Sequence, residues 1–135
     1  MPPLTTERNT AARSGSRLNL GVAAAVLIFA GSLVARNAAG NAIPGATAVG
    51  ILGAGRAVDT VDNTLGLAGA RRVEIDKGIF RFDNLAADLV TIAMVGTDCF
   101  IVDDQTVAAT NGGATRSVAG RVFDVDAQGV WVVFE

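Results

Sequence analysis

Short runs of β-branched and aromatic residues, separated by turn-forming residues, are the dominant pattern along this chain. The pattern is clearest near the C-terminus, where Val118–Val125 and Val130–Phe134 flank Asp126–Gly129. Two such runs joined by Asp, Gln and Gly predict a β-hairpin. A Gly-rich loop at Asn111–Gly113 joins the hairpin to another strand, predicted over Cys99–Val102. The C-terminal third therefore predicts a β-scaffold.

Strand signals continue through the middle of the chain. Ala70–Asp76 alternates so that Val73 and Ile75 share one face, and Gly78–Phe82 continues after a bend. Asp83–Val90 contains a candidate helical turn. Strand signals at intervals of about 8–15 residues are typical of a small β-sandwich or β-barrel, so the predicted fold class is all-β.

The segment Leu18–Ala35 carries no charged residue and follows three arginines, as a signal peptide or a membrane anchor would. Two glycines, Gly21 and Gly31, interrupt it, and the rest of the chain would lack apolar packing partners without it. We therefore predict two buried strands, about Val22–Phe29 and Leu33–Arg36. The alternative is a small membrane-anchored or exported β-domain that uses residues 18–35 as anchor or signal.

Residues 1–17 differ in composition from the rest, because they are polar and contain only one large apolar side chain besides Met1. Such a segment cannot bury enough surface to fold alone. We predict an extended N-terminal arm, followed by a single β-rich domain over residues 18–135. Prolines favour extended backbone, and arginines bind carboxylates in a bidentate manner. The candidate contact residues of the arm are Pro2, Pro3, Leu4, Arg8, Arg13 and Arg17.

Composition excludes several classes of chemistry. Half of the 135 residues are hydrophobic, the net charge is −2 and there is no His, which removes His-based acid–base catalysis and most transition-metal sites. The arginines are scattered and form no basic surface for nucleic acid. The single cysteine, Cys99, adjoins Phe100 in a strand-like run, which predicts a buried, unreactive thiol.

One motif has the outline of a dinucleotide-binding turn. An apolar run leads into Gly53 and Gly55, and Glu74 follows about twenty residues later. Val58, however, occupies the place of the third glycine, and the segment after it is a poor helix. We therefore predict a strand in which the two glycines mark a bulge or a close backbone approach.

Four acidic residues lie at or beside predicted turns, since Asp103 and Asp104 open one turn and Asp124 and Asp126 flank the start of the next. Solvated turn residues are the simplest interpretation of these carboxylates, and the spacing of an EF-hand calcium loop is absent. We expect no catalytic residue, no metal site and no cofactor, and hence a protein that binds rather than catalyses.

Four segments of the chain form a recognisable set of motifs, namely PPLTTERNT, RRVEIDKGIFRFDN, GTDCFIVDDQTVAAT and RSVAGRVFDVDAQGVWVVF. With these motifs the chain resembles a family of small capsid cement (head decoration) proteins of tailed phages and prophages. The resemblance covers nearly the whole chain, Leu4–Phe134, and is strongest over Val73–Asn84 and Cys99–Val132. The chain departs from the pattern around Leu27, where related sequences often place a polar or charged residue.

The resemblance implies a β-rich, non-enzymatic protein that sits as a homotrimer on the outside of the mature head. Its partners would be the major capsid protein and other copies of itself, with neither nucleic acid nor membrane involved. It would be located on the virion surface after assembly in the host cytoplasm. By this interpretation the arm lies along the capsid or along an adjacent protomer, where an extended segment adds main-chain hydrogen bonds to a sheet edge.

Overall fold

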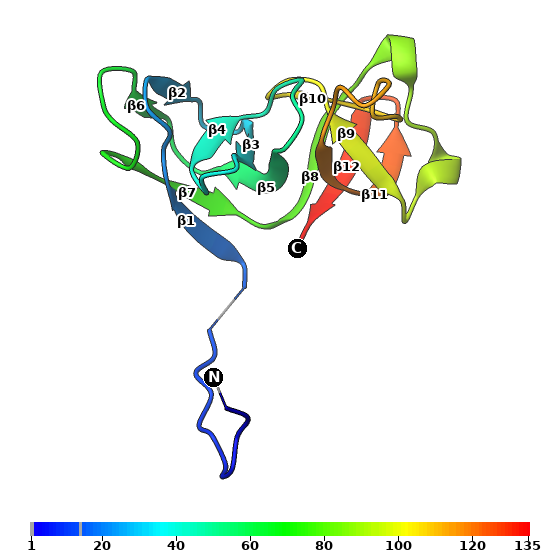
Figure 1. Ribbon diagram of the computed structural model, residues 1–135. Coiled ribbons are helices and arrows are strands. Elements are labelled where there is room, and N and C mark those ends of the chain that lie inside the picture. Colours follow the sequence, from blue (N-terminus) through cyan, green and yellow to red (C-terminus); the bar gives the residue numbers. More distant parts are fainter. Residues whose placement is uncertain (1, 14) are drawn as a thin grey trace.

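The computed structural model describes residues 2–13 and 15–135, and the fold they form is all-β, as the sequence predicts (Figure 1). The connection after β8 holds two short 3-10 helices, η1 (Ala86–Asp88) and η2 (Ile92–Met94). The strands are β1 (Arg17–Gly21), β2 (Val26–Ile28), β3 (Leu33–Arg36), β4 (Ala42–Pro44), β5 (Leu52–Ala57), β6 (Val61–Asn63), β7 (Arg72–Asp76), β8 (Gly78–Asn84), β9 (Asp98–Ile101), β10 (Thr106–Ala108), β11 (Val118–Asp126) and β12 (Gly129–Phe134).

The first seven strands form an open sheet with a small companion sheet. The open sheet has the order β1-β7-β5-β3-β4, and β2 pairs with β6 beside it. The alternation predicted for β7 is confirmed, because Val73 and Ile75 are buried and Glu74 between them is not. β1 runs antiparallel to β7 with Arg17 opposite Asp76, so β1 forms one edge of the sheet.

The last five strands close into a barrel of order β10-β8-β12-β11-β9. The predicted C-terminal hairpin is confirmed, since β11 and β12 pair antiparallel around a turn at Ala127 and Gln128. Closure depends on a parallel pairing of β10 with β8, in which Thr106 lies opposite Asp83. Of the two predicted architectures, the barrel is the one present, with the open sheet packed beside it.

The predicted strand over Val22–Phe29 is only partly correct. Only Val26–Ile28 of that range forms a strand, β2; β1 has already ended at Gly21, Val22 makes an isolated bridge to Ala42, and a turn precedes Val26. Ala25 occupies the left-handed region with φ 59°, which L-residues other than Asn and Asp rarely adopt, so no sequence signal marked the break. The predicted strand Leu33–Arg36 is confirmed as β3.

Two hydrophobic clusters form the core. One fills the open sheet around Val22, Ile28 and Ile75, and the other fills the barrel. Strand β3 serves both, because Val34 points into the sheet cluster while Leu33 and Ala35 point into the barrel cluster. This alternation along one strand joins the two halves.

The apolar segment of residues 18–35 is built into this core as β1, β2 and β3. Val22, Ile28 and Val34 are fully buried in the sheet cluster. Over the described ranges 2–13 and 15–135, no helix is long and apolar enough to cross a membrane.

Candidate docking surfaces

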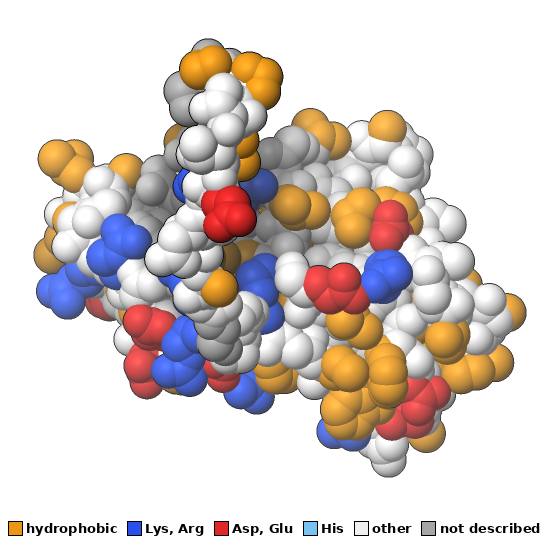
Figure 2. Space-filling model, turned by 90° about the horizontal axis from the view of Figure 1, so that it is seen from below, with side chains coloured by type: hydrophobic (Ala, Val, Ile, Leu, Met, Phe, Trp, Pro, Cys, Tyr) orange, Lys and Arg blue, Asp and Glu red, His pale blue; other side chains and the backbone are white. Residues whose placement is uncertain are grey.

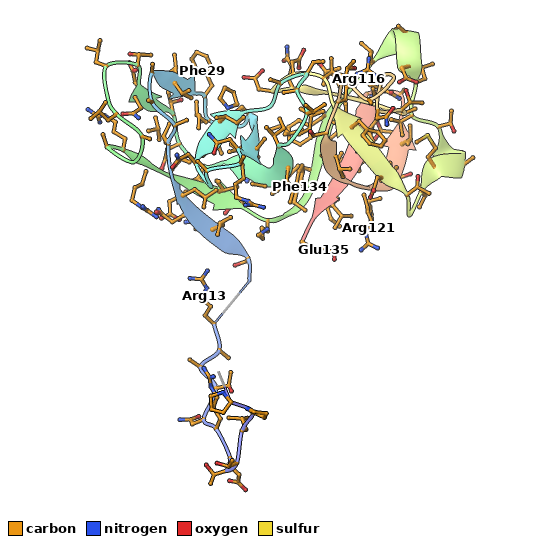
Figure 3. The ribbon with its side chains drawn as sticks, viewed as in Figure 1. Arg13, Phe29, Arg116, Arg121, Phe134 and Glu135 are labelled. Atoms are coloured by element: carbon orange, nitrogen blue, oxygen red, sulfur yellow. The ribbon has the colours of Figure 1, made fainter. Side chains whose placement is uncertain are left out.

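The N-terminal arm extends away from the body of the protein (Figure 1). Residues 2–13 are all exposed and contain neither helix nor strand. Among the described residues, no hydrogen bond or ion pair joins 2–13 to the body. Five of the six predicted contact residues, Pro2 to Arg13, therefore present their side chains to solvent, and Arg13 is labelled on this segment in Figure 3.

Arg17, the sixth predicted contact residue, differs because it is the first residue of β1. Its Nε donates to Asp76 Oδ1 at 3.0 Å, and Asp76 Oδ2 accepts from Arg56 at 3.1 Å. The hydrogen bond from Arg17, followed by that from Arg56, lowers the pKa of the Asp76 carboxyl below its usual value. The arm thus starts from a fixed base on the sheet edge. The sequence did not reveal the pairing of Arg17 with Asp76 that fixes this base.

The base of the arm is also tied to the barrel. The Arg56 guanidinium lies 4.3 Å from the centre of the Phe80 ring, which is 6.3 Å from the Phe134 ring. Lys77, which connects β7 to β8, donates its main-chain N–H to Ser16 and its Nζ to the main-chain oxygen of Glu135 at 2.9 Å. Lys77 therefore holds the base of the arm and Glu135 close to each other.

An apolar groove lies on the outside of the barrel, where β8, β11 and β12 meet the connection after η2. Three large apolar side chains line it with exposed fractions between 41% and 54%, namely Ile79, Val95 and Phe123. Arg121 and Glu135 form an ion pair at its rim. Figure 3 places both labelled side chains on the side of the barrel toward which the arm extends. Figure 2 shows hydrophobic side chains gathered on the barrel half of this face.

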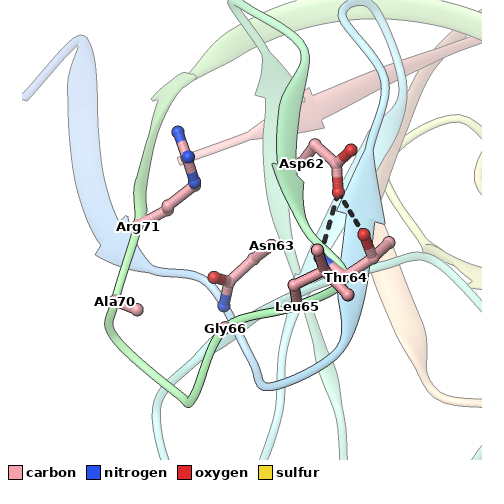
Figure 4. Close-up of a pocket in the computed structure, with 7 residues that line it drawn as sticks. All are labelled: Asp62, Asn63, Thr64, Leu65, Gly66, Ala70 and Arg71. Carbon is pink, nitrogen blue, oxygen red and sulfur yellow. Dashed lines mark hydrogen bonds between the residues drawn. The ribbon is translucent and has the colours of Figure 1, made fainter.

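A second hollow lies at the loop between β6 and β7 (Figure 4). The hydroxyl and main-chain N–H of Thr64 both donate to Asp62, which lowers the pKa of that carboxyl. The amide of Asn63 donates to the main-chain oxygens of Val22, Ala23 and Leu67 at 3.0 to 3.3 Å. The Asp62 carboxylate and the Asn63 amide nitrogen thus hold the loop in place, whereas the buried Oδ1 of Asn63 has no hydrogen-bond partner among the described residues.

The two glycines of the Gly-x-Gly motif lie inside β5, which confirms the prediction of a strand. A register shift between β3 and β5 skips the residue between Gly53 and Gly55, as in a β-bulge. Gly53 faces the barrel main chain so closely that a Cβ atom would lie 1.9 Å from the Ala119 oxygen. Gly55 has φ 148°, within the range that favours glycine. Gly53 thus serves packing between the open sheet and the barrel, whereas Gly55 packs against Ile75 and Asp76 of β7 within its own sheet.

Three of the four acidic residues predicted at or beside turns accept hydrogen bonds through their carboxylates. Asp103 accepts from the main-chain N–H of Gln105, and Asp124 from that of Val125. Asp126 accepts from two N–H groups of the hairpin turn and, at 2.8 Å, from Trp131 Nε1. In residues 2–13 and 15–135, no group of three or more acidic or Cys side chains is arranged to hold a metal ion.

Cys99 is fully buried in the barrel core, as predicted, and burial raises the pKa of its thiol to about 12. A thiol in this state is a poor nucleophile.

Comparison with known proteins adds no relative, because no protein-family model, curated protein or solved structure matches the chain.

Proposed function

We propose that this protein is a non-enzymatic head-decoration (cement) protein of a tailed phage or prophage. It binds the outside of the capsid as a homotrimer and stabilises contacts between major capsid subunits. It is located on the virion surface after assembly in the host cytoplasm. The proposal extends the sequence resemblance over Leu4–Phe134, and one structural observation supports it above the others. That observation is an exposed arm that starts from a fixed base on a closely packed β-body.

This arrangement suits a protein that clamps a surface. A body held by two hydrophobic clusters stays folded while the arm remains available to a partner. Residues 2–13 offer main-chain groups of which only the Thr10 N–H and the Arg8 oxygen are paired with each other, the apolar side chain of Leu4 (72% exposed) and the guanidinium groups of Arg8 and Arg13. An extended segment of this kind binds by adding a strand to a neighbouring sheet and by pairing its arginines with carboxylates.

The test is removal of the arm without disturbing its base. Deleting residues 2–13 leaves Arg17 and its hydrogen bond to Asp76 in place. We expect this truncated protein to keep the thermal unfolding midpoint of the full chain but to lose co-sedimentation with phage heads assembled without decoration protein. Undiminished head binding by the truncated protein would contradict the role of the arm.

A point-mutant series separates specific contacts from general charge. The Arg8→Ala/Arg13→Ala variant should bind heads more weakly, because it removes two cations of the arm. Arg36→Ala is the matched control, since Arg36 is also exposed but lies on the body in β3. Equal loss of head binding in both variants would indicate non-specific electrostatic attraction.

A further inference from the structure

The apolar groove of the barrel, lined by Ile79, Val95 and Phe123, is produced by a specific irregularity. The register between β11 and β12 shifts between Val122 and Asp124, so Phe123 is the extra residue of a β-bulge. Bulges re-aim side chains, and here Phe123 is left 54% exposed while Val122 is buried in the barrel core. The groove therefore has an outward-turned aromatic ring at its edge.

The backbone brings Val95 to the same place. Gly96 donates its N–H to Val122 at 2.8 Å, and Val122 donates to Thr97 at 2.9 Å. These two hydrogen bonds fix the connection after η2 against β11, so that Val95 lies in the groove with Phe123. The apolar side chains thus sit on hydrogen-bonded backbone, and a partner would meet a preformed surface.

Charge at the rim indicates what kind of partner fits. Arg121 and Glu135 border the groove, and their side chains are 54% and 67% exposed. A patch that carries one cation and one anion beside an apolar centre is complementary to another copy of itself, because the cation of one copy can face the anion of the next. A strongly acidic or basic partner would leave one of the two charges facing a like charge.

We propose that the groove is the contact between copies of this chain. Phe123 and Val95 supply the apolar centre, and Arg121 of one copy pairs with the outer side of Glu135 of another. The barrel is closed and offers no free strand edge, so side chains rather than strand addition make this contact. The inference rests on the proposed function in that it assigns a surface to the self-association proposed there.

The first test is the sedimentation velocity of the purified full chain, without heads, over micromolar concentrations. We expect the wild-type protein to sediment as an oligomer. Phe123→Asp and Val95→Asp, either of which places a charge in the groove, should each weaken association at least about 30-fold. Leu65→Asp is the matched control, because Leu65 is fully exposed on the β6–β7 loop of the open sheet. Unfolding midpoints show which variants remain folded.

The second test uses charge reversal. R121E and E135R should each self-associate more weakly than wild type, because each places like charges at both rim positions. An equimolar mixture of the two variants should associate more strongly than either alone, since opposite charges then face each other between copies. A mixture no stronger than its components would overturn the proposed pairing.

The remaining outcomes separate this inference from the proposed function. A wild-type protein that stays monomeric, or a folded Phe123→Asp variant that stays oligomeric, would overturn the groove as a self-contact. Head binding is measured separately by co-sedimentation. A monomeric wild-type protein that still binds heads overturns the groove and the trimeric state but leaves head binding standing, whereas an oligomer that ignores heads overturns head decoration but leaves the groove standing. Phe123→Asp that remains oligomeric but loses head binding would assign the groove to the capsid and overturn the inference.

Discussion

Gly53 in β5 faces Ala119 in β11 so closely that a Cβ atom on Gly53 would lie 1.9 Å from the Ala119 carbonyl oxygen. The approach joins the open sheet to the barrel at a point where both partners are main chain. Main-chain atoms cannot move aside as the end of a flexible side chain can. The contact between the halves therefore requires glycine at this position.

Replacing Gly53 by Ala should lower the free energy of unfolding by about 3 kcal/mol, because the added methyl group forces the two backbones apart. Chemical denaturation followed by tryptophan fluorescence measures the change, since the one Trp of the chain, Trp131, lies in β12 of the barrel. Gly15→Ala is the control, as a Cβ there meets no atom within 4 Å. Equal stability of the two variants would show that the halves do not pack as described.

The carboxylate of Asp76 should contribute to stability in a pH-dependent way. Its pKa is lowered in the folded state, so its contribution is present above the ordinary carboxyl pKa and is lost as the pH falls through the folded value. Asp76→Asn should therefore be less stable than wild type near pH 7, and the difference should shrink as the pH is lowered toward about 2. Thermal melts at both pH values measure this difference. Asp59→Asn, which removes an exposed carboxylate between β5 and β6, should show no such convergence.

Asn63 should be essential for the loop between β6 and β7. Asn63→Asp removes three donated hydrogen bonds and places a carboxylate against three carbonyl oxygens, so the free energy of unfolding should fall by at least about 2 kcal/mol. Urea denaturation measures the loss. The same substitution at Asn9, in the exposed arm, should leave stability unchanged. A small effect at Asn63 would mean that solvent reaches the three carbonyl groups.

The loop between β10 and β11 is fastened by Asp88. Its Oδ2 accepts from Arg116 at 2.9 Å and from the hydroxyl and main-chain N–H of Thr110, which lower the pKa of the carboxyl. Asp88→Ala should free Arg116 and raise the rate of tryptic cleavage after it roughly tenfold or more. Mass spectrometry of the fragments identifies the site. Asp83→Ala is the control, because Asp83 is an exposed residue of β8. A cleavage rate that is unchanged in both variants would show that other contacts hold the loop.

The Cys99 thiol should not react with a disulfide reagent at about pH 8 while the protein is folded, because burial both excludes the reagent and raises the thiol pKa. Denaturation in urea should release one reactive thiol per chain, and the absorbance of the released reagent counts it. Rapid labelling of the native protein would mean that β9 opens readily. The signal is unambiguous because the chain has a single cysteine.

Local chemistry explains which parts of the fold the sequence predicted. The C-terminal hairpin is confirmed because its strands alternate and its turn uses Asp126 and Gly129, so each signal acts over a few residues. The strand containing Gly53 is confirmed for a related reason, since Val58 and the residues after it conflict with a helix.

Features that depend on distant pairings were not predicted. Barrel closure requires β10 to pair in parallel with β8, and no local pattern specifies that partner. The Arg17–Asp76 pair joins residues far apart in sequence, and the outward turn of Phe123 follows from a bulge that carries no glycine. The groove and the base of the arm therefore became visible only in the folded chain. The contact role of the arm stays a prediction.

The division of the described chain into a sheet and a barrel has a consequence for its synthesis. The chain crosses from one half to the other between β7 and β8, so a ribosome releases the whole open sheet before any barrel strand. Leu33 and Ala35, made early, belong to the same buried cluster as Val132 and Phe134, which are made much later. A nascent chain thus carries an uncovered apolar strand until β12 has been synthesised, and this interval is when aggregation competes most strongly with folding.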